Sequence, residues 1–349
     1  MRKIALIILF VMVIINLGIG NTGWEEGVKL YKERRYTEAI KEFKDVIKYN
    51  PNIPNGYFML GLCNYNIGNG KEAIDNFKKV LDLDNNHKGA LFYIGKIYYD
   101  LSNCYEAVKY FSSALSGNSD SVTVLSILKL RASCYLKMKA YDSAINDLKI
   151  LNDSNQNDAA TFYLLGLAYY NKGEIKLAEG ALRKALELEP SNRDYIVIMM
   201  NILIDLKKYE EAVKYGQIIL AKNNNDQDLI ELLADAYLGK KNYYQAIVLY
   251  KSLGNPSDRC LINIAQAYSF LGEYKQAESI LEALVKKGSR NDKIYDLLAY
   301  VYEKMSELEK ALSTYKKVYQ MTKKEKYRDS IKRVEEKIKQ KELEQSLVQ

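Results

Sequence analysis

One alanine recurs along this chain at a nearly constant interval. The recurring positions are Ala39, Ala73, Ala107, Ala144, Ala178, Ala212, Ala246, Ala277 and Ala311. Successive members lie 34 residues apart, except for one interval of 37 and one of 31. A fixed period of roughly 20 to 50 residues is typical of proteins that stack copies of one small supersecondary unit. The period therefore predicts a repeat protein with about nine repeats.

Residues 159–192 show the pattern of a single repeat. Apolar and small residues recur there at helical spacing, at Phe162, Leu165, Gly166 and Tyr169. Gly173 is expected to end this helix, and a second apolar stripe that contains Ala178 continues as far as Pro190. We expect Gly166 and Ala178 to face each other, because two antiparallel helices cross closely where small side chains meet. Each repeat is thus predicted to be a helix pair.

The other repeats carry matching residues at matching places. The position of Gly166 is filled by Gly27, Gly61, Gly95, Ala132, Ala234, Ala265 and Ala299, with Met200 as the exception. Together with the tyrosines and alanines in register, this pattern resembles the tetratricopeptide repeat (TPR) family. Its signature is an aromatic residue, Leu-Gly, Tyr, Ala, a large apolar residue, Ala and Pro at set offsets. The resemblance implies an all-α, right-handed α-solenoid superhelix that binds protein segments in a concave groove.

The resemblance covers residues 21–323. The nine repeats are expected at about 20–53, 54–87, 88–121, 125–158, 159–192, 193–226, 227–257, 258–291 and 292–323, with irregularities around 122–124 and 254–257. Residues 324–349 lack the signature but keep an apolar line from Tyr327 to Leu343. Between Lys316 and Gln345, eleven Lys or Arg face six Asp or Glu. We expect a basic amphipathic helix that caps the last repeat, with contact to an anionic membrane or an acidic partner as the alternative.

Residues 1–20 have the composition of a secretory signal. Two basic residues, Arg2 and Lys3, precede an apolar run over residues 4–15, and Gly18-Ile19-Gly20 offers a cleavage site before Asn21. Three alternatives stay open, namely a cleaved signal peptide, an uncleaved N-terminal membrane anchor and a buried structural helix. The first two place the repeats outside the cytoplasm, in the periplasm or cell envelope, and the second holds them at the inner membrane.

The chain has few of the side chains and motifs that catalytic sites use. It has one histidine, His87, at a junction between repeats, and four cysteines without a C-x-x-C motif, although a disulfide stays open. Residues 4–315 are neutral overall and so lack the basic field of a nucleic-acid binder. We therefore expect no enzyme activity, no cofactor, no metal and no nucleic-acid partner.

The first helix of each repeat is expected to line the groove on the side away from its packing stripe. These positions are aromatic or apolar in repeats 1, 2, 3 and 5: Trp24, Tyr31, Phe58, Leu62, Tyr65, Phe92, Tyr99, Tyr163, Leu167 and Tyr170. They are acidic in repeats 6 and 7: Asp194, Asp205, Asp228, Glu231 and Asp235. Exposed aromatic residues often anchor partners. The alternative is that Trp24, Phe58 and Phe92 fill the interface between repeats.

These features predict a non-enzymatic scaffold that binds a protein segment in the groove, in a bacterial envelope context. The acidic positions favour a partner with basic residues. The chaperone-binding TPR subclass clamps a C-terminal carboxylate with Lys, Asn and Arg, and the early groove positions here lack that set, with only Lys96 basic. The alternative function is a membrane-anchored accessory subunit of a secretion, pilus or cell-wall synthesis machine.

Overall fold

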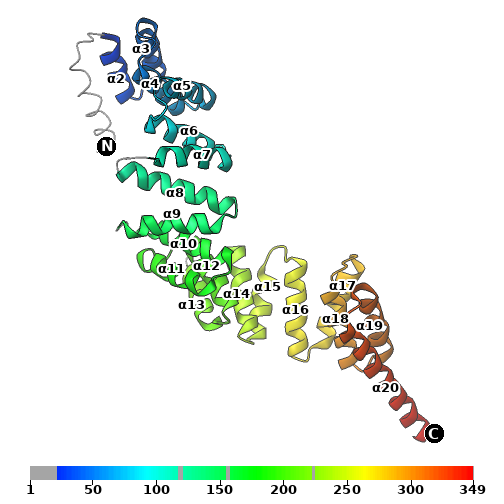
Figure 1. Ribbon diagram of the computed structural model, residues 1–349. Helices are drawn as coiled ribbons and strands as arrows, with labels where there is room; N and C mark the ends of the chain where they lie inside the picture. The colour runs from blue at the N-terminus through cyan, green and yellow to red at the C-terminus, as the bar shows by residue number, and fades with distance from the viewer. Residues whose placement is uncertain (1–21, 117–120, 155–157, 222–224, 349) are drawn as a thin grey trace. The chain divides into compact units, whose positions relative to one another are not determined.

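A computed structural model describes residues 22–116, 121–154, 158–221 and 225–348, and within these ranges all regular structure is helical. The chain divides after Gly173 into two compact units, each described by itself below. Figure 1 shows the helices in chain order. The predicted all-α class is confirmed.

The N-terminal unit contains four helix pairs and one further helix. They are α2 (Thr22–Lys32) with α3 (Tyr36–Tyr49), α4 (Pro54–Asn66) with α5 (Gly70–Leu83), α6 (Lys88–Asp100) with α7 (Cys104–Leu115), α8 (Ser121–Lys137) with α9 (Tyr141–Asp153), and then α10 (Ala159–Lys172). We call the first helix of each pair its A helix and the second its B helix. Every helix packs on the one that follows it, from α2 to α10.

The C-terminal unit begins with one helix, continues with four pairs and ends with a long helix. They are α11 (Ile175–Leu188), α12 (Arg193–Asp205) with α13 (Tyr209–Leu220), α14 (Gln227–Gly239) with α15 (Tyr243–Ser252), α16 (Asp258–Phe270) with α17 (Tyr274–Lys286), α18 (Asp292–Lys304) with α19 (Leu308–Thr322), and α20 (Glu325–Val348). The predicted helices of nine repeats and a terminal helix are therefore all present.

A residue in the left-handed backbone conformation ends the A helix of every repeat. These residues are Arg34, Gly68, Ser102, Lys139, Gly173, Lys207, Lys241, Gly272 and Ser306, and their φ angles lie between 59° and 89°. Each lies five residues before the recurring alanine, so the turns repeat with the same intervals as the alanines. In most turns the residue after the left-handed one donates its backbone N–H to a carbonyl of the A helix. Asn103, which follows Ser102, donates in this way to the Tyr98 carbonyl at 2.8 Å.

In the first three repeats the glycine of the A helix meets an aromatic ring of the B helix, a contact that the sequence analysis did not predict. A Cβ added at Gly27, Gly61 or Gly95 would lie 2.8, 2.5 or 2.7 Å from a phenylalanine ring. The rings belong to Phe43, Phe77 and Phe111 of the paired B helices, and all three are fully buried. Glycine is therefore required so that each ring can lie against the backbone of the A helix.

The two unequal intervals between alanines correspond to two unusual helices. The interval of 37 contains α8, which has 17 residues where most A helices have 13. The interval of 31 contains α15, which has 10 residues and is the shortest described helix. An insertion and a deletion are thus absorbed by helix length and by the adjoining connections, while the A–B turns keep their form.

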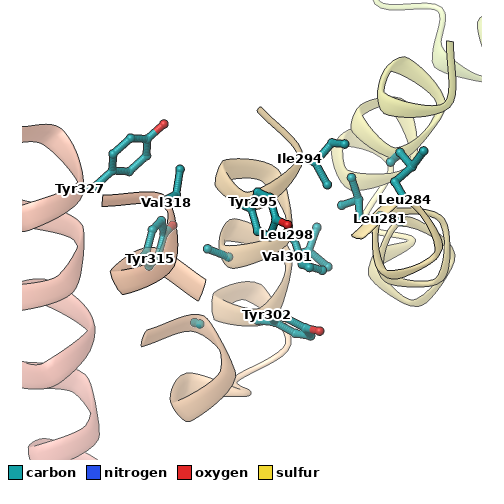
Figure 2. Packing of buried hydrophobic residues seen from close by; sticks show 14 of the residues in the cluster. Leu281, Leu284, Ile294, Tyr295, Leu298, Val301, Tyr302, Tyr315, Val318 and Tyr327 are labelled. Atoms are coloured by element: carbon teal, nitrogen blue, oxygen red, sulfur yellow. The ribbon is translucent and has the colours of Figure 1, made fainter. Parts of the chain in front are cut away.

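The last helix, α20, covers the apolar face of α19 as predicted for a capping element. Tyr327 and Val334 are buried, and Ile331 and Ile338 pack against the same cluster. Figure 2 shows Tyr327 beside Tyr315 and Val318 of α19. Leu343 is 61% exposed, so the apolar contact ends before the helix does.

The predicted signal or anchor in residues 1–20 lies outside the described residues. Among the helices that the structure does describe, none combines the length and the apolar character that a membrane span requires.

Candidate partner-binding surface

Three tyrosines of successive A helices form a regular series in the N-terminal unit. Tyr31, Tyr65 and Tyr99 occupy equivalent places on α2, α4 and α6, and each is half-buried. We call this set the tyrosine ladder. The three lie 34 residues apart, so the repeat itself positions their rings along one set of helices.

Each tyrosine of the ladder contacts a polar residue of the next A helix. The Asn66 side chain donates to the Tyr31 hydroxyl at 3.4 Å, and the Tyr65 hydroxyl donates to Asp100 at 3.2 Å. Lys137 Nζ lies 5.2 Å from the ring centroid of Tyr99. Burial raises the pKa of Tyr31 to about 12, so this hydroxyl stays protonated at neutral pH. The ladder therefore joins apolar rings to exposed hydrogen-bonding groups.

Three other predicted groove residues pack against a phenylalanine of their own helix pair. The rings of Trp24, Phe58 and Phe92 lie 5.5, 5.6 and 6.3 Å from those of Phe43, Phe77 and Phe111. Phe58 and Phe92 also contact Tyr93, at 6.0 and 5.2 Å. These contacts give the three residues a packing role. The alternative interpretation of the sequence, which placed them in the interface between repeats, fits Phe58, because Tyr93 belongs to the next repeat.

The remaining predicted aromatic and apolar positions differ in burial. Leu62 is 4% exposed and belongs to the core of α4 with Leu60 and Cys63, so its side chain is not presented at the surface. Tyr163, Leu167 and Tyr170 lie on α10 and are half-buried.

Two arginines partly neutralise the predicted acidic positions of the C-terminal unit. Arg193 donates to Asp226 at 2.8 Å and to Asp228 at 3.0 Å, and its guanidinium lies 3.5 Å from Asp194. Arg259 donates to Asp235 at 2.9 Å and forms a close ion pair with Glu231. Five carboxylates thus share two guanidinium groups, and Asp205 is exposed as well. The patch is therefore acidic, but less so than the sequence positions alone suggested.

Asp235 is the centre of a hydrogen-bonded network. Its carboxylate accepts from the hydroxyl of Tyr250, which is fully buried on α15, and from the Asn263 amide at 3.2 Å. Burial first, and then the charge of Asp235, raise the pKa of Tyr250. Because Arg259 also binds this carboxylate, Asp235 is held in place and serves the fold as well as the surface.

The basic residues of the terminal segment bind carboxylates of α18. Lys324 pairs with Asp292 at 3.0 Å, and Lys326 pairs with Asp296 at 2.7 Å. Arg333 and Lys337 both pair with Glu303, whose side chain is 9% exposed. Much of the local positive charge is thus engaged inside the C-terminal unit.

His87 caps helix α6 between two repeats. Its Nδ1 accepts a hydrogen bond from the Ala90 N–H at 3.1 Å, and its ring lies 4.8 Å from that of Phe58. The same N-cap place is taken by Asp158, Asn192, Asp226, Ser257 and Asn291 in later repeats, each with its side chain as acceptor. Burial lowers the pKa of His87 below 6.5, against the charge of Asp84.

The stability of the N-terminal unit is expected to fall between pH 7 and pH 5 because of His87. The neutral ring is favoured in the fold, so its contribution is present above pH 6.5 and is lost as the pH falls through the lowered pKa. Protonation removes the acceptor for the Ala90 N–H, a cap worth about 1 kcal/mol. His87→Asn should retain a cap and flatten this part of the pH dependence, measured by thermal unfolding at each pH. Equal pH slopes for the two proteins would contradict this role.

Sequence reasoning missed the polar partners of the surface. Each of these partners follows its ladder tyrosine by about one repeat. Asn66 and Asp100 lie 35 residues after Tyr31 and Tyr65, and Lys137 lies 38 residues after Tyr99, across the longer interval. A search at these offsets would have indicated all three. Arg193 stands at the start of α12, outside the positions that the helical wheel selected. In the described ranges, no group of three or more His, Cys, Asp or Glu side chains is placed to hold a metal ion.

Comparison with protein families gives matches along most of the array. A model described as tetratricopeptide repeat matches residues 125–262, and a second such model matches residues 258–286 and 292–325. A model described as anaphase-promoting complex, cyclosome, subunit 3 matches residues 32–114.

Two curated proteins are similar over part of the chain. Anaphase-promoting complex subunit CDC16 of Saccharomyces cerevisiae is 34% identical over 122 residues, which are 33% of this chain and 13% of that protein. BBSome complex member BBS4 of Bos taurus is 23% identical over 227 residues, which are 54% of this chain and 44% of that protein. The chain thus spans less than half the length of these relatives.

Solved structures show the same fold. A tetratricopeptide repeat protein from Parabacteroides merdae ATCC 43184 aligns with a TM-score of 0.50 at 20% identity, over 71% of this chain and 98% of that one. YrrB, described as a TPR protein with an unusual peptide-binding site, aligns with a TM-score of 0.50 at 17% identity, over 54% and 95%. The two tetratricopeptide repeat models together match more than half of the chain, and with the repeated helix pairs they show that the chain belongs to the tetratricopeptide repeat family.

Proposed function

We propose that this chain is a scaffold that binds an extended or helical protein segment across the tyrosine ladder, in a bacterial envelope context. TPR proteins mediate protein–protein interactions, and the description of YrrB names a peptide-binding site on the same fold. The observation that carries the proposal is the ladder itself. Its rings are half-buried, and its polar partners Asn66, Asp100 and Lys137 are exposed.

This surface suits a segment with apolar side chains at intervals. Half-buried tyrosine rings lose little further conformational freedom when a partner covers them, because the contacts beneath already restrain them. The exposed Asn66 amide, Asp100 carboxylate and Lys137 ammonium lie next to the rings and can bond the backbone or polar side chains of the segment.

The acidic patch of the C-terminal unit adds a preference for basic residues in the partner. Arg193 and Arg259 leave an excess of negative charge among the carboxylates that they bind. Exposed charges of this kind govern association rate and orientation more than affinity. We also propose a non-enzymatic role, because the partly buried Asp235 and Glu303 are held in ion pairs.

Substitution of single ladder tyrosines is expected to weaken binding of the segment that the wild-type chain captures from its native envelope. Tyr65→Ala and Tyr99→Ala should each lower the affinity about tenfold, as expected when an aromatic anchor is truncated. Asp205→Ser with Asp228→Ser should reduce it only modestly, and more at low salt than at high salt. Affinity and salt dependence are measured with the purified segment.

A matched control is Tyr105→Ala, because Tyr105 is 71% exposed and lies on the B helix α7. It should bind as the wild type does. Unchanged affinity of both ladder variants, or loss of binding accompanied by loss of helicity, would show that the ladder is core and not a docking surface.

The alternative function, a membrane-anchored accessory subunit of a secretion, pilus or cell-wall synthesis machine, depends on residues 1–20. The apolar run that follows Arg2 and Lys3 supports either a cleaved signal or an anchor. N-terminal sequencing of the chain from its native host separates the two. A mature chain that begins near Asn21 supports the exported scaffold, an intact Met1 in the membrane fraction supports the anchored subunit, and an intact Met1 on a soluble cytoplasmic protein contradicts both.

A further inference from the structure

Two of the four cysteines lie on the adjoining helices of the third and fourth repeats. Cys104 is the first residue of α7, and Cys134 lies on α8. They belong to one apolar cluster, with Ala107, Phe111 and Ile127. Cys104 is a close enough neighbour of Cys134 to add to burial in raising the pKa of the Cys134 thiol. Cys63 and Cys260 lie in other clusters.

A disulfide requires two cysteines on neighbouring elements with their Cβ atoms about 4 Å apart. Helices α7 and α8 pack directly on each other, and both cysteines are buried in the one apolar cluster that these helices share. We propose that Cys104 and Cys134 form a reversible disulfide that links α7 to α8. The structure describes the reduced form of this pair.

The reaction is a thiol–disulfide exchange with a small-molecule disulfide or the disulfide of an oxidoreductase. One cysteine attacks the oxidant and forms a mixed disulfide, releasing one thiol. The second cysteine then attacks that bond, forming the internal disulfide and releasing the second thiol. Two protons and two electrons pass from the protein thiols to the oxidant, which is reduced to two thiols.

Accessibility assigns the order of the two attacks. Cys104 is 8% exposed and Cys134 is fully buried, so Cys104 meets the oxidant first and Cys134 closes the bond. Burial raises the pKa of Cys134 to about 12, which makes its thiolate scarce in the folded chain. We therefore expect slow closure in the native protein and faster closure during folding.

The place of the pair gives the bond a structural consequence. Residues 104 and 134 enclose the start of α8, the long helix of the 37-residue interval between Ala107 and Ala144. A disulfide here restricts the unfolded chain over a loop of about thirty residues, and its effect grows with loop length. The bond would thus fix the irregular joint between repeats 3 and 4.

The test uses the purified full chain with oxidised glutathione as the probe. One sample is incubated folded, and another is refolded from denaturant in the same buffer. Non-reducing digestion and mass spectrometry should find the peptides of Cys104 and Cys134 joined, in at least the refolded sample. Relative to the reduced chain, the oxidised chain should melt roughly 5–10 °C higher, and a reductant should abolish the difference.

Variants separate this bond from general effects of oxidation. Cys63→Ala should keep both the linked peptide and the melting shift. Cys104→Ser should lose both while its reduced form melts close to the wild type, because residue 104 lies at the first position of a helix. Four free thiols in both samples, or a link between other cysteines, would overturn the inference. The same peptide analysis of chain isolated from cells tests a different proposal. If the bond forms in the purified protein but is absent from the chain in cells, that result counts against export and leaves the inference about the cysteine pair intact.

Discussion

Gly61→Ala is expected to destabilise the N-terminal unit by about 1–3 kcal/mol, the usual cost of overfilling a packed core. The added Cβ would lie 2.5 Å from Cε1 of Phe77, and two further atoms of the same ring lie within 2.8 Å. Phe77 is fully buried and cannot retreat without disturbing its neighbours. Alanine normally stabilises a helix interior by roughly 0.5–1 kcal/mol relative to glycine, so the sign is reversed here. Urea unfolding and hydrogen exchange of α4 and α5 measure the change.

Gly180→Ala provides the matched control. Gly180 lies inside α11, it is exposed, and no atom stands within 4 Å of an added Cβ. This variant should therefore gain about 0.5–1 kcal/mol. A second variant, Gly61→Ala with Phe77→Leu, should recover part of the lost stability because the smaller side chain vacates the contact. If Gly61→Ala alone is as stable as the wild type, the ring does not depend on the glycine.

The sequence was sufficient to predict the helix pairs, because periodicity reports local packing. The recurring alanine, the stop at Gly173 and the terminal apolar line all correspond to observed features. What the small residue faces could not be predicted in the same way. Gly61 meets Phe77 across two helices, and side-chain length decides that contact more than position on the helical wheel does.

The surface was harder to predict than the fold. A helical wheel places Phe58 and Tyr65 on the same side of α4, yet Phe58 packs on Phe77 while Tyr65 reaches Asp100 of the next A helix. The difference depends on contacts between repeats, which one helix does not encode. Charge pairing was missed for the same reason, because Arg193 reaches Asp226 and Asp228 more than thirty residues away.

One buried ion pair shows how a single repeat departs from the common pattern. Arg131 of α8 stands where most other A helices carry an apolar residue, such as Leu60 in α4. Its guanidinium donates to both oxygens of Asp147 on α9, at 2.8 and 2.7 Å, and to the Ser112 hydroxyl at 3.0 Å. The Asp147 side chain is only 5% exposed, so its charge depends on this partner.

Arg131→Met is therefore expected to cost about 3–5 kcal/mol, because it leaves a buried carboxylate without its counter-ion. Asp147→Leu should cost less, since a long arginine side chain can turn its charged end toward water. The double variant should recover most of the loss, because an apolar pair of similar size replaces both charges. Denaturant unfolding of the four proteins gives the coupling energy between the two sites.

The exposed pair of Lys79 and Asp82 supplies the comparison. Both side chains are 64% exposed at 3.2 Å, so Lys79→Met should change stability by no more than about 0.5 kcal/mol. The contrast isolates burial as the cause, since both pairs join a cation to a carboxylate. A loss for Arg131→Met as small as that for Lys79→Met would mean that water reaches Asp147 in the variant. The two charges would then contribute no more than a surface pair, and the fourth repeat would hold together by its apolar contacts alone.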